Sequence, residues 1–244
     1  MKFTIHRLDT CISTNDVARE MARGGAAAGT VVVADEQTAG RGTKGRSWIS
    51  LRGKGLYVSV LVRPRSPEIA LLPLAAGLAA RDAVELACGL SPALRWPNDI
   101  VWKGKKLGGI LCESAFLGNR PDYAILGTGL NADHAEEDFP EDLRPLAVSI
   151  RIAAGKSPDR EALLGALLAQ TGRRIEAVER GEGEGILRDF GLRSVFQPGD
   201  PITILVGDSP IQGEYRGLAA DGGLLLGGPG GVRSYAGAEI VKVL

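Results

Sequence analysis

The chain changes character near residue 185, and this change restricts the folds that it can adopt. Before Gly181, runs with helical spacing alternate with short apolar runs that fit buried strands. From about Phe196 onward, only short β-type runs remain, and glycine-rich turns separate them. We therefore predict a mixed α/β domain over residues 1–190, followed by a small β-barrel of five short strands over residues 196–244.

Within the first part, three helical patterns and five strand patterns define the predicted elements. The helices are expected to begin at Ser13, at Ser66-Pro67-Glu68 and at Ser157-Pro158-Asp159, which are residues that favour a helix start. Leu71, Leu78 and Leu86 are expected on the core-facing side of the second helix. Strands are expected over 31–34, 56–62, 100–102, 107–112 and 123–126, and in the second part over 202–206, 211–218, 224–226, 232–235 and 239–243. A turn at 103–104 predicts a hairpin.

The charge balance excludes one large class of functions. The chain has 29 Lys plus Arg and 29 Asp plus Glu residues, which gives a formal net charge of zero. Binding to nucleic acid or to an anionic membrane through bulk charge needs a positive surplus, so we expect neither partner. No apolar run reaches the roughly 20 residues of a membrane helix. Three scattered cysteines fit neither a disulfide framework nor a zinc motif, so we expect a cytoplasmic location and no protein-bound metal.

Glycine and positive charge concentrate in the segment from Gln37 to Trp48, QTAGRGTKGRSW. By coincidence this segment contains the G-x-G-x-x-G of dinucleotide-binding folds and nearly a phosphate-binding P-loop. Both motifs require a helix directly after the loop, and the residues after Trp48 have neither helical spacing nor a cap. Basic side chains among backbone amides freed by glycine still favour an anion, most simply a nucleotide phosphate. A solvated surface loop with incidental charge is the alternative.

Two further segments place polar groups beside strands. The sequence RWPND at 95–99 precedes the predicted hairpin, and KLGGI at 106–110 opens its second strand. Successive strand residues point to opposite faces, so only one of Lys105 and Lys106 can face the working side of the sheet. Glycines along the strands leave room for a ligand to lie on them. Taken alone, a lysine beside a strand is more often a solvated charge at a sheet edge.

Five motifs, taken in order, resemble the motif series of biotin protein ligases. They are Ser13-Thr14-Asn15, the loop from Gln37 to Trp48, RWPND at 95–99, KLGGIL at 106–111 and GTGLN at 127–131. The resemblance covers most of the chain. It implies an α/β catalytic domain of the class II synthetase type, a mixed sheet with helices, and a C-terminal SH3-like β-barrel.

The resemblance also implies a two-step reaction. Biotin and ATP, with Mg²⁺, give biotinyl-5'-AMP and pyrophosphate. The biotinyl group then passes to one lysine of a biotin carboxyl carrier protein, the carrier domain of a biotin-dependent carboxylase. Members of the family often dimerise, so a homodimer is a further expectation.

Candidate residues for both substrates follow from the resemblance. Lys106 and Arg41 would neutralise the two acids as they approach each other, and Asp99 would accept or orient the proton of the attacking lysine. A turn-capping carboxylate is the structural alternative for Asp99. The expected biotin-binding residues are Ser13, Thr14, Gln37, Gly40, Arg41, Lys106, Gly109, Ile110, Gly127 and Thr128. The expected ATP- and adenylate-binding residues are Arg41, Thr43, Arg46, Trp48, Asn98, Lys106 and Asn131.

The chain departs from the family at three points, one of which is Gly108 where alanine is common; the other two bear on function. Many members carry arginine where this chain has Thr43, so we expect the adenylate to be retained less firmly. Only twelve residues precede Ser13, which leaves no room for the helix-turn-helix domain of the ligase-repressors. We therefore expect the short form of the enzyme, without a repressor function.

Two other functions stay open at this point. The first is a lipoate or octanoyl ligase or transferase of the same fold. In a transferase a cysteine thiolate could carry the acyl chain, and strand alternation predicts that Cys112 shares the face of Lys106. The second is a non-catalytic module that binds biotin or a nucleotide.

Overall fold

The computed structural model describes residues 1–243. Its main feature is a seven-stranded sheet in the order β1-β2-β3-β7-β6-β5-β4. β1 runs parallel to β2, and all other neighbours in the sheet are antiparallel. The strands are β1 (Thr4–Cys11), β2 (Thr30–Gln37), β3 (Gly55–Val62), β4 (Ala93–Arg95), β5 (Asp99–Trp102), β6 (Lys105–Leu117) and β7 (Arg120–Asn131). The predicted mixed sheet and its hairpin are therefore present.

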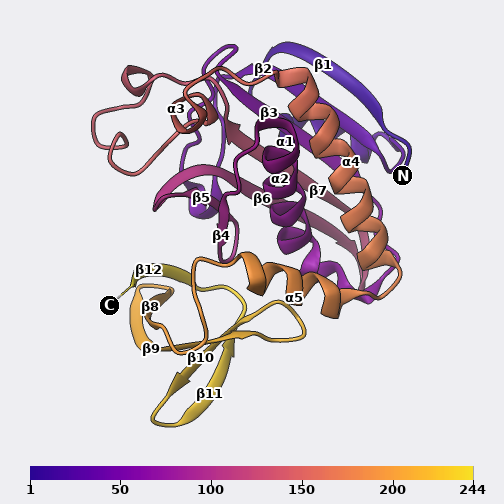
Figure 1. Ribbon diagram of the computed structural model, residues 1–244. Coiled ribbons are helices and arrows are strands. Elements are labelled where there is room, and N and C mark those ends of the chain that lie inside the picture. The colour runs from indigo at the N-terminus through magenta and orange to yellow at the C-terminus, as the bar shows by residue number, and fades with distance from the viewer. Residues whose placement is uncertain (244) are drawn as a thin grey trace.

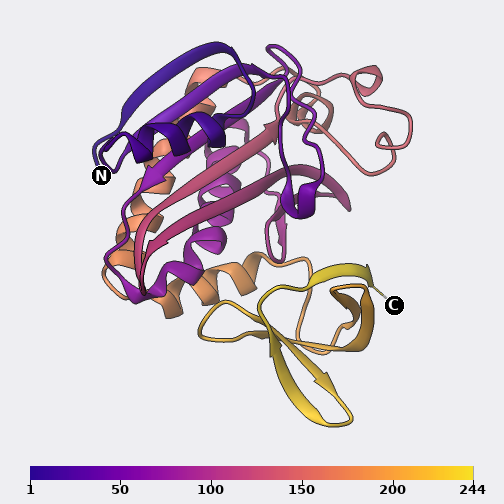
Figure 2. The same cartoon turned by 180° about the vertical axis from the view of Figure 1, so that it is seen from behind.

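Helices cover both faces of this sheet (Figures 1 and 2). One face packs with α2 and α4 in the main hydrophobic cluster, and the other packs with α1 in a smaller cluster that includes Ala18, Val32 and Ile125. The helices are α1 (Thr14–Arg23), α2 (Leu72–Cys88), α3 (Ile150–Ala154), α4 (Arg160–Glu179) and α5 (Gly183–Arg193), with 3-10 turns at Thr43–Gly45, Pro67–Leu71 and Glu136–Asp138. Within residues 1–243, no helix combines the length and the apolar character that a bilayer crossing requires.

The three predicted helices begin where the sequence indicates, with one correction inside the second. Ser13 adopts the extended conformation of an N-cap before α1, Ser66 caps the 3-10 turn that leads into α2, and Asp159 caps α4. The prediction that Leu86 faces the core is wrong, because its side chain is 67% exposed. The core-facing row at the end of α2 continues from the buried Val84 to the partly buried Cys88, and Leu86 falls outside this i, i+4 spacing.

The five predicted C-terminal strands are all present, but they form an open sheet. They are β8 (Pro201–Val206), β9 (Ser209–Leu218), β10 (Leu224–Gly228), β11 (Gly231–Tyr235) and β12 (Glu239–Val243), in the order β11-β10-β9-β8-β12. Within the described part of the chain, the edge strands β11 and β12 do not pair, so the predicted barrel is not confirmed. Turn residues indicate where strands end, but closure depends on strand tilt and stagger, which they do not fix.

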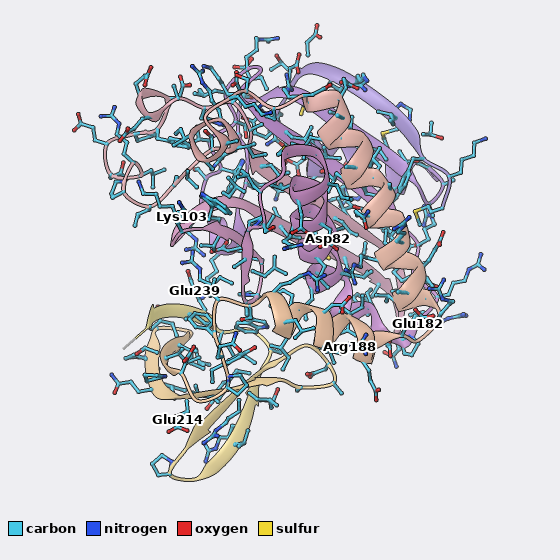
Figure 3. The ribbon with its side chains drawn as sticks, viewed as in Figure 1. Asp82, Lys103, Glu182, Arg188, Glu214 and Glu239 are labelled. Carbon is cyan, nitrogen blue, oxygen red and sulfur yellow. The ribbon has the colours of Figure 1, made fainter. Side chains whose placement is uncertain are left out.

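Helix α5 joins the two sheets. Its Phe190 belongs to the same hydrophobic cluster as Ile202 and Tyr215 of the C-terminal sheet. Ion pairs tie α5 to the first part of the chain, since Arg174 of α4 contacts both Asp82 of α2 at 2.8 Å and Asp189 of α5 at 2.6 Å. Figure 3 shows the C-terminal sheet below α5, with Glu239 at its upper side. This placement brings the segment before β12 next to the main sheet.

Candidate functional site

Two adjoining clefts open over the middle of the seven-stranded sheet. The first encloses about 450 Å³ of space, part of which is open to solvent. The second is larger, encloses about 1610 Å³ including space open to solvent, and extends toward the C-terminal sheet. Both are lined by Gly42, Thr43, Trp48, Asn98 and Lys106. A ligand in one cleft can therefore meet a ligand in the other beside these residues.

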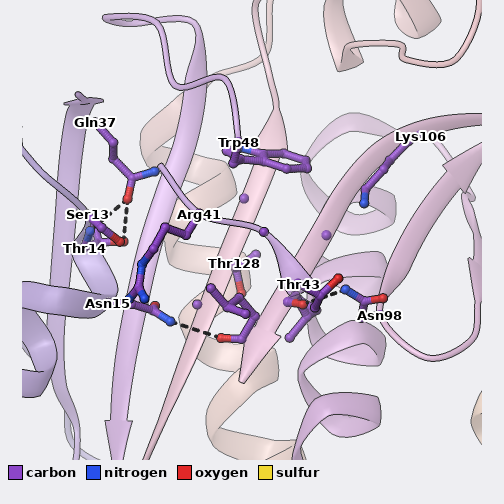
Figure 4. Close-up of a pocket in the computed structure, with 16 residues that line it drawn as sticks. Ser13, Thr14, Asn15, Gln37, Arg41, Thr43, Trp48, Asn98, Lys106 and Thr128 are labelled. Carbon is purple, nitrogen blue, oxygen red and sulfur yellow. Dashed lines mark hydrogen bonds between the residues drawn. The ribbon is translucent and has the colours of Figure 1, made fainter. Parts of the chain in front are cut away.

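The site residues expected from the sequence line these clefts, with one exception. Those that line the first cleft alone are Ser13, Thr14, Gln37, Arg41, Gly109, Ile110, Gly127 and Thr128 (Figure 4). Those that line the second alone are Arg46, Asp99 and Asn131, whereas Thr43, Trp48, Asn98 and Lys106 line both. Gly40 lines neither cleft. A Cβ at this position would lie 2.4 Å from the carbonyl oxygen of Trp48, so Gly40 allows the loop to fold back on itself.

A bulge in β6 controls which side chains face the first cleft. The β5 residues Ile100 and Val101 pair with Gly108 and Lys106, so Leu107 is the extra residue on β6. Lys106 and Gly109 consequently share a face, although three positions separate them. A Cβ on Gly109 would lie 3.2 Å from Cε of Lys106.

The same bulge reverses the faces of the residues that follow it. The prediction that Cys112 shares the face of Lys106 is wrong, because Cys112 packs against the main core cluster on the other side of the sheet. Burial raises the pKa of its thiol to about 12. Ile110 belongs to that core cluster, and Thr128 lies on β7 between the core residues Leu126 and Leu130. Strand alternation therefore indicates that Ile110 and Thr128 reach the cleft through their backbone.

Lys106 occupies the boundary between the clefts and is held there by charge and by backbone bonds. Its Nζ lies 2.5 Å from Oδ1 of Asp99, and the other oxygen of Asp99 lies 2.6 Å from Nη2 of Arg95. The Lys106 backbone N–H donates to the carbonyl of Leu146, and its carbonyl accepts from Val148. Asp99 thus forms ion pairs with two cations, which differs from the turn-capping alternative. The ion pair with Asp99 therefore holds the ammonium group of Lys106 beside both clefts.

Trp48 forms an apolar wall at this boundary. Its indole ring lies against β7, since a Cβ on Gly129 would come within 2.7 Å of two indole atoms. The ammonium of Lys106 lies 5.4 Å from the ring centroid, within the range of a cation–π contact. Glycine at position 129 is therefore the residue that gives the indole its place on the sheet.

At the opposite end of the first cleft, α1 contributes a polar group of side chains. The backbone N–H of Thr14 donates to Oε1 of Gln37 at 2.8 Å, and Nε2 of Gln37 donates to Ser50. Arg41 lies at this end, where its Nη2 contacts Asp16 at 2.7 Å and Glu113 at 3.2 Å. The structure therefore separates Arg41 from Lys106, which lies across the cleft (Figure 4).

The remaining cations of the glycine loop contact the C-terminal sheet. Nζ of Lys44 lies 3.1 Å and Nη1 of Arg46 lies 2.7 Å from the carboxylate of Glu239. Partial burial acts to raise the pKa of Glu239, but hydrogen bonds from Arg46 and Lys44 hold it below its usual range. The two cations are thus gathered at one side of the second cleft, where Glu239 neutralises part of their charge.

Much of the second cleft is apolar, and the sequence did not indicate this surface. Phe139, Leu143 and Leu146 come from the loop after β7, and residues 236–240 come from the C-terminal sheet. Asn131 joins this loop to the sheet, because its Nδ2 donates to the carbonyls of Lys106 and Val148 at 3.3 and 3.2 Å. Within residues 1–243, no group of three or more His, Cys, Asp or Glu side chains is placed to hold a metal ion.

Three residues of the first cleft and its floor were not among the expected binding residues, although Asn15 belongs to the first motif. Asn15 lines the cleft, while Ser59 and Glu113 hold its side chain from β3 and β6. Ser59 carried a usable signal, since it is the one polar residue of the buried strand GLYVSVLV apart from a tyrosine. A fully buried hydroxyl requires a hydrogen-bond partner, so it pointed to further polar residues nearby.

Comparisons with known proteins agree on one family. A family model described as the biotin/lipoate A/B protein ligase family matches residues 10–131. The biotin--[acetyl-CoA-carboxylase] ligase of Paracoccus denitrificans is 34% identical over 233 residues, which cover 93% of this chain and 96% of that protein. The bifunctional ligase/repressor BirA of Bacillus spizizenii is 39% identical over 161 residues, and the match covers 64% of this chain. It covers 49% of BirA, so the chain spans about half the length of that relative.

The fold comparison extends over the whole chain. The solved structure of biotin protein ligase from Aquifex aeolicus in complex with biotin and ATP matches with a TM-score of 0.85 and 28% sequence identity. The match covers 99% of each chain.

Proposed function

Because the chain belongs to the biotin/lipoate A/B protein ligase family, we propose that it is a biotin protein ligase. It activates biotin with ATP to biotinyl-5'-AMP and transfers the biotinyl group to a lysine of a biotin carboxyl carrier protein. One observation carries the proposal, namely two clefts of different character that meet beside a single fixed ammonium, that of Lys106. The names of the related proteins and the complex of the Aquifex aeolicus enzyme support the choice of substrates.

In the first step, two anions must approach each other. A biotin carboxylate oxygen attacks the α-phosphorus of ATP, and pyrophosphate leaves with the electrons of the broken bond. Lys106 lies between the clefts and can stabilise the negative charge that gathers on the reacting oxygens. We assign biotin to the first cleft, where Thr14 and Gln37 offer hydrogen-bonding atoms, and ATP to the larger second cleft.

The second cleft offers suitable groups for each part of a nucleotide. Its apolar side, from Phe139 to Leu146, can cover the adenine base. Lys44 and Arg46 can pair with the phosphates once these compete with Glu239 for the two cations. Mg²⁺ would be bound mainly by phosphate oxygens and water, as is usual for this ion with ATP.

The second step needs an uncharged amine. A free lysine has a pKa of about 10.4, so a neighbouring group must accept or orient its proton. We assign this role to Asp99, which lines the second cleft and lies next to Lys106. Both Asp99 oxygens form ion pairs, one with Arg95 and one with Lys106, so Asp99 also positions Lys106 for the first step.

The lipoate or octanoyl alternative has less support. A transferase that carries its acyl chain on a cysteine needs an accessible thiolate. Cys112 faces the core, and burial raises its thiol pKa to about 12. The polar end of the first cleft also fits a ureido ring better than an alkyl chain, since an alkyl chain would leave its buried polar groups unpaired.

Pyrophosphate exchange into ATP tests the proposal directly. Biotin should stimulate the exchange, whereas lipoate and octanoate should not. Mass spectrometry of a carrier domain incubated with the protein, biotin and ATP should then show one added biotinyl group on a lysine. Exchange driven by lipoate or octanoate instead would favour the alternative, and binding of biotin without any exchange would indicate a non-catalytic module.

Replacing Gly129 with alanine should weaken biotin binding. The added methyl group would lie 2.7 Å from two indole atoms of Trp48, so the ring must leave its place. Overpacking of this kind costs about 1–3 kcal/mol, and we expect a loss of affinity of about tenfold. Titration calorimetry measures the change. Gly165→Ala on α4 is the matched control, because a Cβ there meets nothing within 4 Å. Unchanged affinity in Gly129→Ala would show that the indole does not form the wall of the biotin cleft.

Thr43 leads to a prediction about retention of the intermediate. Thr43 lines both clefts, and its hydroxyl contacts Arg46 at 3.3 Å. A threonine offers no charge to the adenylate phosphate, so we expect biotinyl-5'-AMP to leave faster than from Thr43→Arg. Release of radiolabelled adenylate on a gel-filtration column measures both rates. Lys44→Ala is the control that tests whether the neighbouring ammonium of Lys44 retains the adenylate in place of a charge at position 43. Equal release from the native protein and Thr43→Arg would discard the prediction.

Several sequence predictions remain proposals. We propose that residues 1–190 and 196–244 are the two domains, and that the second belongs to the SH3-like type. The five antiparallel strands in under fifty residues support that assignment. The homodimer and the cytoplasmic location stay predictions from the sequence.

A further inference from the structure

A chain of four polar side chains lies beneath the first cleft and ends at Thr14. Ser59 is fully buried, and its Oγ lies 2.6 Å from Oδ1 of Asn15 and 2.8 Å from Oγ1 of Thr14. Nδ2 of Asn15 lies 2.7 Å from Oε2 of Glu113. Asn15 and Thr14 are themselves almost entirely buried, so each donor and acceptor in the chain needs a partner.

Glu113 fixes the direction of this chain at one end. Arg19 donates to its Oε1 at 2.7 Å, and Arg41 and Asn15 contact its Oε2. Arginine has donors only, so the Glu113 oxygens act as acceptors. The amide of Asn15 must therefore turn its NH₂ group toward Glu113 and its oxygen toward Ser59.

The number of hydroxyl protons then determines the direction of the remaining hydrogen bonds, those of Ser59 and Thr14. Ser59 has a single hydroxyl proton, and Oδ1 of Asn15 can only accept, so the 2.6 Å contact takes that proton. The 2.8 Å contact between Ser59 and Thr14 then needs the proton of Thr14. Three oxygen–oxygen contacts, at 2.6, 2.8 and 3.1 Å, compete for the two hydroxyl protons of Ser59 and Thr14. The two shorter contacts take them, so Oγ1 of Thr14 has no proton left for the cleft or for the longer contact to Oε1 of Gln37.

Gln37 presents an acceptor at the same place. Its Nε2 donates to Ser50, so its Oε1 faces Thr14 and accepts the Thr14 backbone N–H at 2.8 Å. The polar end of the first cleft therefore combines two acceptor oxygens, one from Thr14 and one from Gln37. Acceptors of this kind are satisfied by ligand N–H groups, and they disfavour a ligand oxygen in the same position.

We propose that Glu113, Asn15 and Ser59 form a positioning relay that keeps the Thr14 hydroxyl as an acceptor, so that the first cleft selects a ligand ring with an N–H donor. This inference rests on the proposed function, because biotin carries such donors in its ureido ring. Glu113 and Ser59 touch no ligand atom in this account. They act through Thr14 and determine selectivity.

The test compares biotin with its two cyclic carbamate analogues, in which one or the other ureido N–H is replaced by oxygen. Titration calorimetry with the full chain gives the affinity ratio of biotin to each analogue. The wild-type ratio should be at least about 100 for one analogue, because its ring oxygen meets an acceptor. In Ser59→Ala the Thr14 proton is free to turn toward that oxygen, and we expect the ratio to fall at least about tenfold. Glu113→Gln, which can donate to Asn15 and reverse the chain, should shift the ratio in the same direction.

The selectivity ratio separates a positioning role from a structural one. General damage to the cleft would weaken both ligands together and leave the ratio unchanged, and this result would overturn the proposal. Thr30→Val is the matched control, because Thr30 is a buried β2 residue whose hydroxyl bonds Ala27 away from the cleft. If Ser59→Ala fails to fold, Glu113→Gln decides the outcome. A wild-type protein that ligates biotin but has a ratio near one would overturn the relay alone, whereas no binding of biotin would overturn the proposed function and the relay with it.

Discussion

Replacing Lys106 with alanine should remove most adenylate synthesis while the fold persists. Its ammonium is the cation fixed at the boundary of the two clefts, 2.5 Å from Asp99. Removing one preorganised group that stabilises developing negative charge typically lowers a rate by about 10²–10³. The loss should be larger still if Asp99, left with Arg95 alone, then repels the approaching anions. Biotin-dependent pyrophosphate exchange at saturating substrates measures the effect.

Lys105→Ala is the matched control for this variant. Lys105 is the adjacent residue of the same strand, and its Nζ donates to the carbonyl of Arg144 at 3.0 Å. The Lys105→Ala variant should retain adenylate synthesis. Both variants should give the circular dichroism spectrum of the native protein. Exchange that survives in Lys106→Ala, or that disappears equally in both variants, would contradict the assignment of Lys106.

Acid should destabilise the protein through His134, by up to about 3 kcal/mol. The ring is fully buried and stacks on Phe139 at a centroid distance of 5.0 Å. Burial lowers the pKa of His134 from 6.5 to about 4, with Lys54 acting in the same direction and Asp138 against it. The unfolded chain therefore binds a proton on this residue at a higher pH than the folded protein. Stability is complete above pH 6.5 and falls as the pH decreases toward 4.

Urea unfolding at several pH values between 7 and 4 checks this expectation. Carboxylates titrate in the same range, so the informative quantity is the difference between the native protein and His134→Phe, which keeps an aromatic ring against Phe139. The free energy of unfolding of the native protein, relative to that of His134→Phe, should decrease as the pH falls from 6.5 toward 4. His6→Gln, which removes the other histidine of the chain, is the control and should keep the slope due to His134. Parallel curves for the native protein and His134→Phe would show that the buried ring does not couple folding to protons.

The strands around the site could be predicted because their sequences carry strong local signals. Every residue of β3, GLYVSVLV, is buried, and the continuous apolar run reflects this directly. The turn at 103–104 gives the β5–β6 hairpin for a similar reason, since Lys103 and Gly104 both adopt positive φ angles there. We could expect particular residues at the clefts mainly because five motifs, spread between residues 13 and 131, occur in the same order as in the family.

Elements that depend on tertiary contacts were missed. β1 has exposed side chains at six of its eight positions, so it shows no apolar face, and its pairing with β2 determines its structure. α5 contains three glycines, which disfavour a helix locally. Burial of Ile186 and Phe190 against the rest of the protein outweighs that preference. The wall of the second cleft has the same origin, since Phe139 and residues 236–240 are about a hundred positions apart.

The extra residue in β6 limits how this gene can tolerate small insertions and deletions. Leu107 lets Lys106 face the substrates while the following positions return to the core pattern. Deleting one codon there would restore regular pairing, but it would also rotate either the lysine or every later side chain of the strand to the wrong face. Point substitutions in β6 can be compensated one at a time, whereas a single-codon change has to be matched by a second one in the same short stretch.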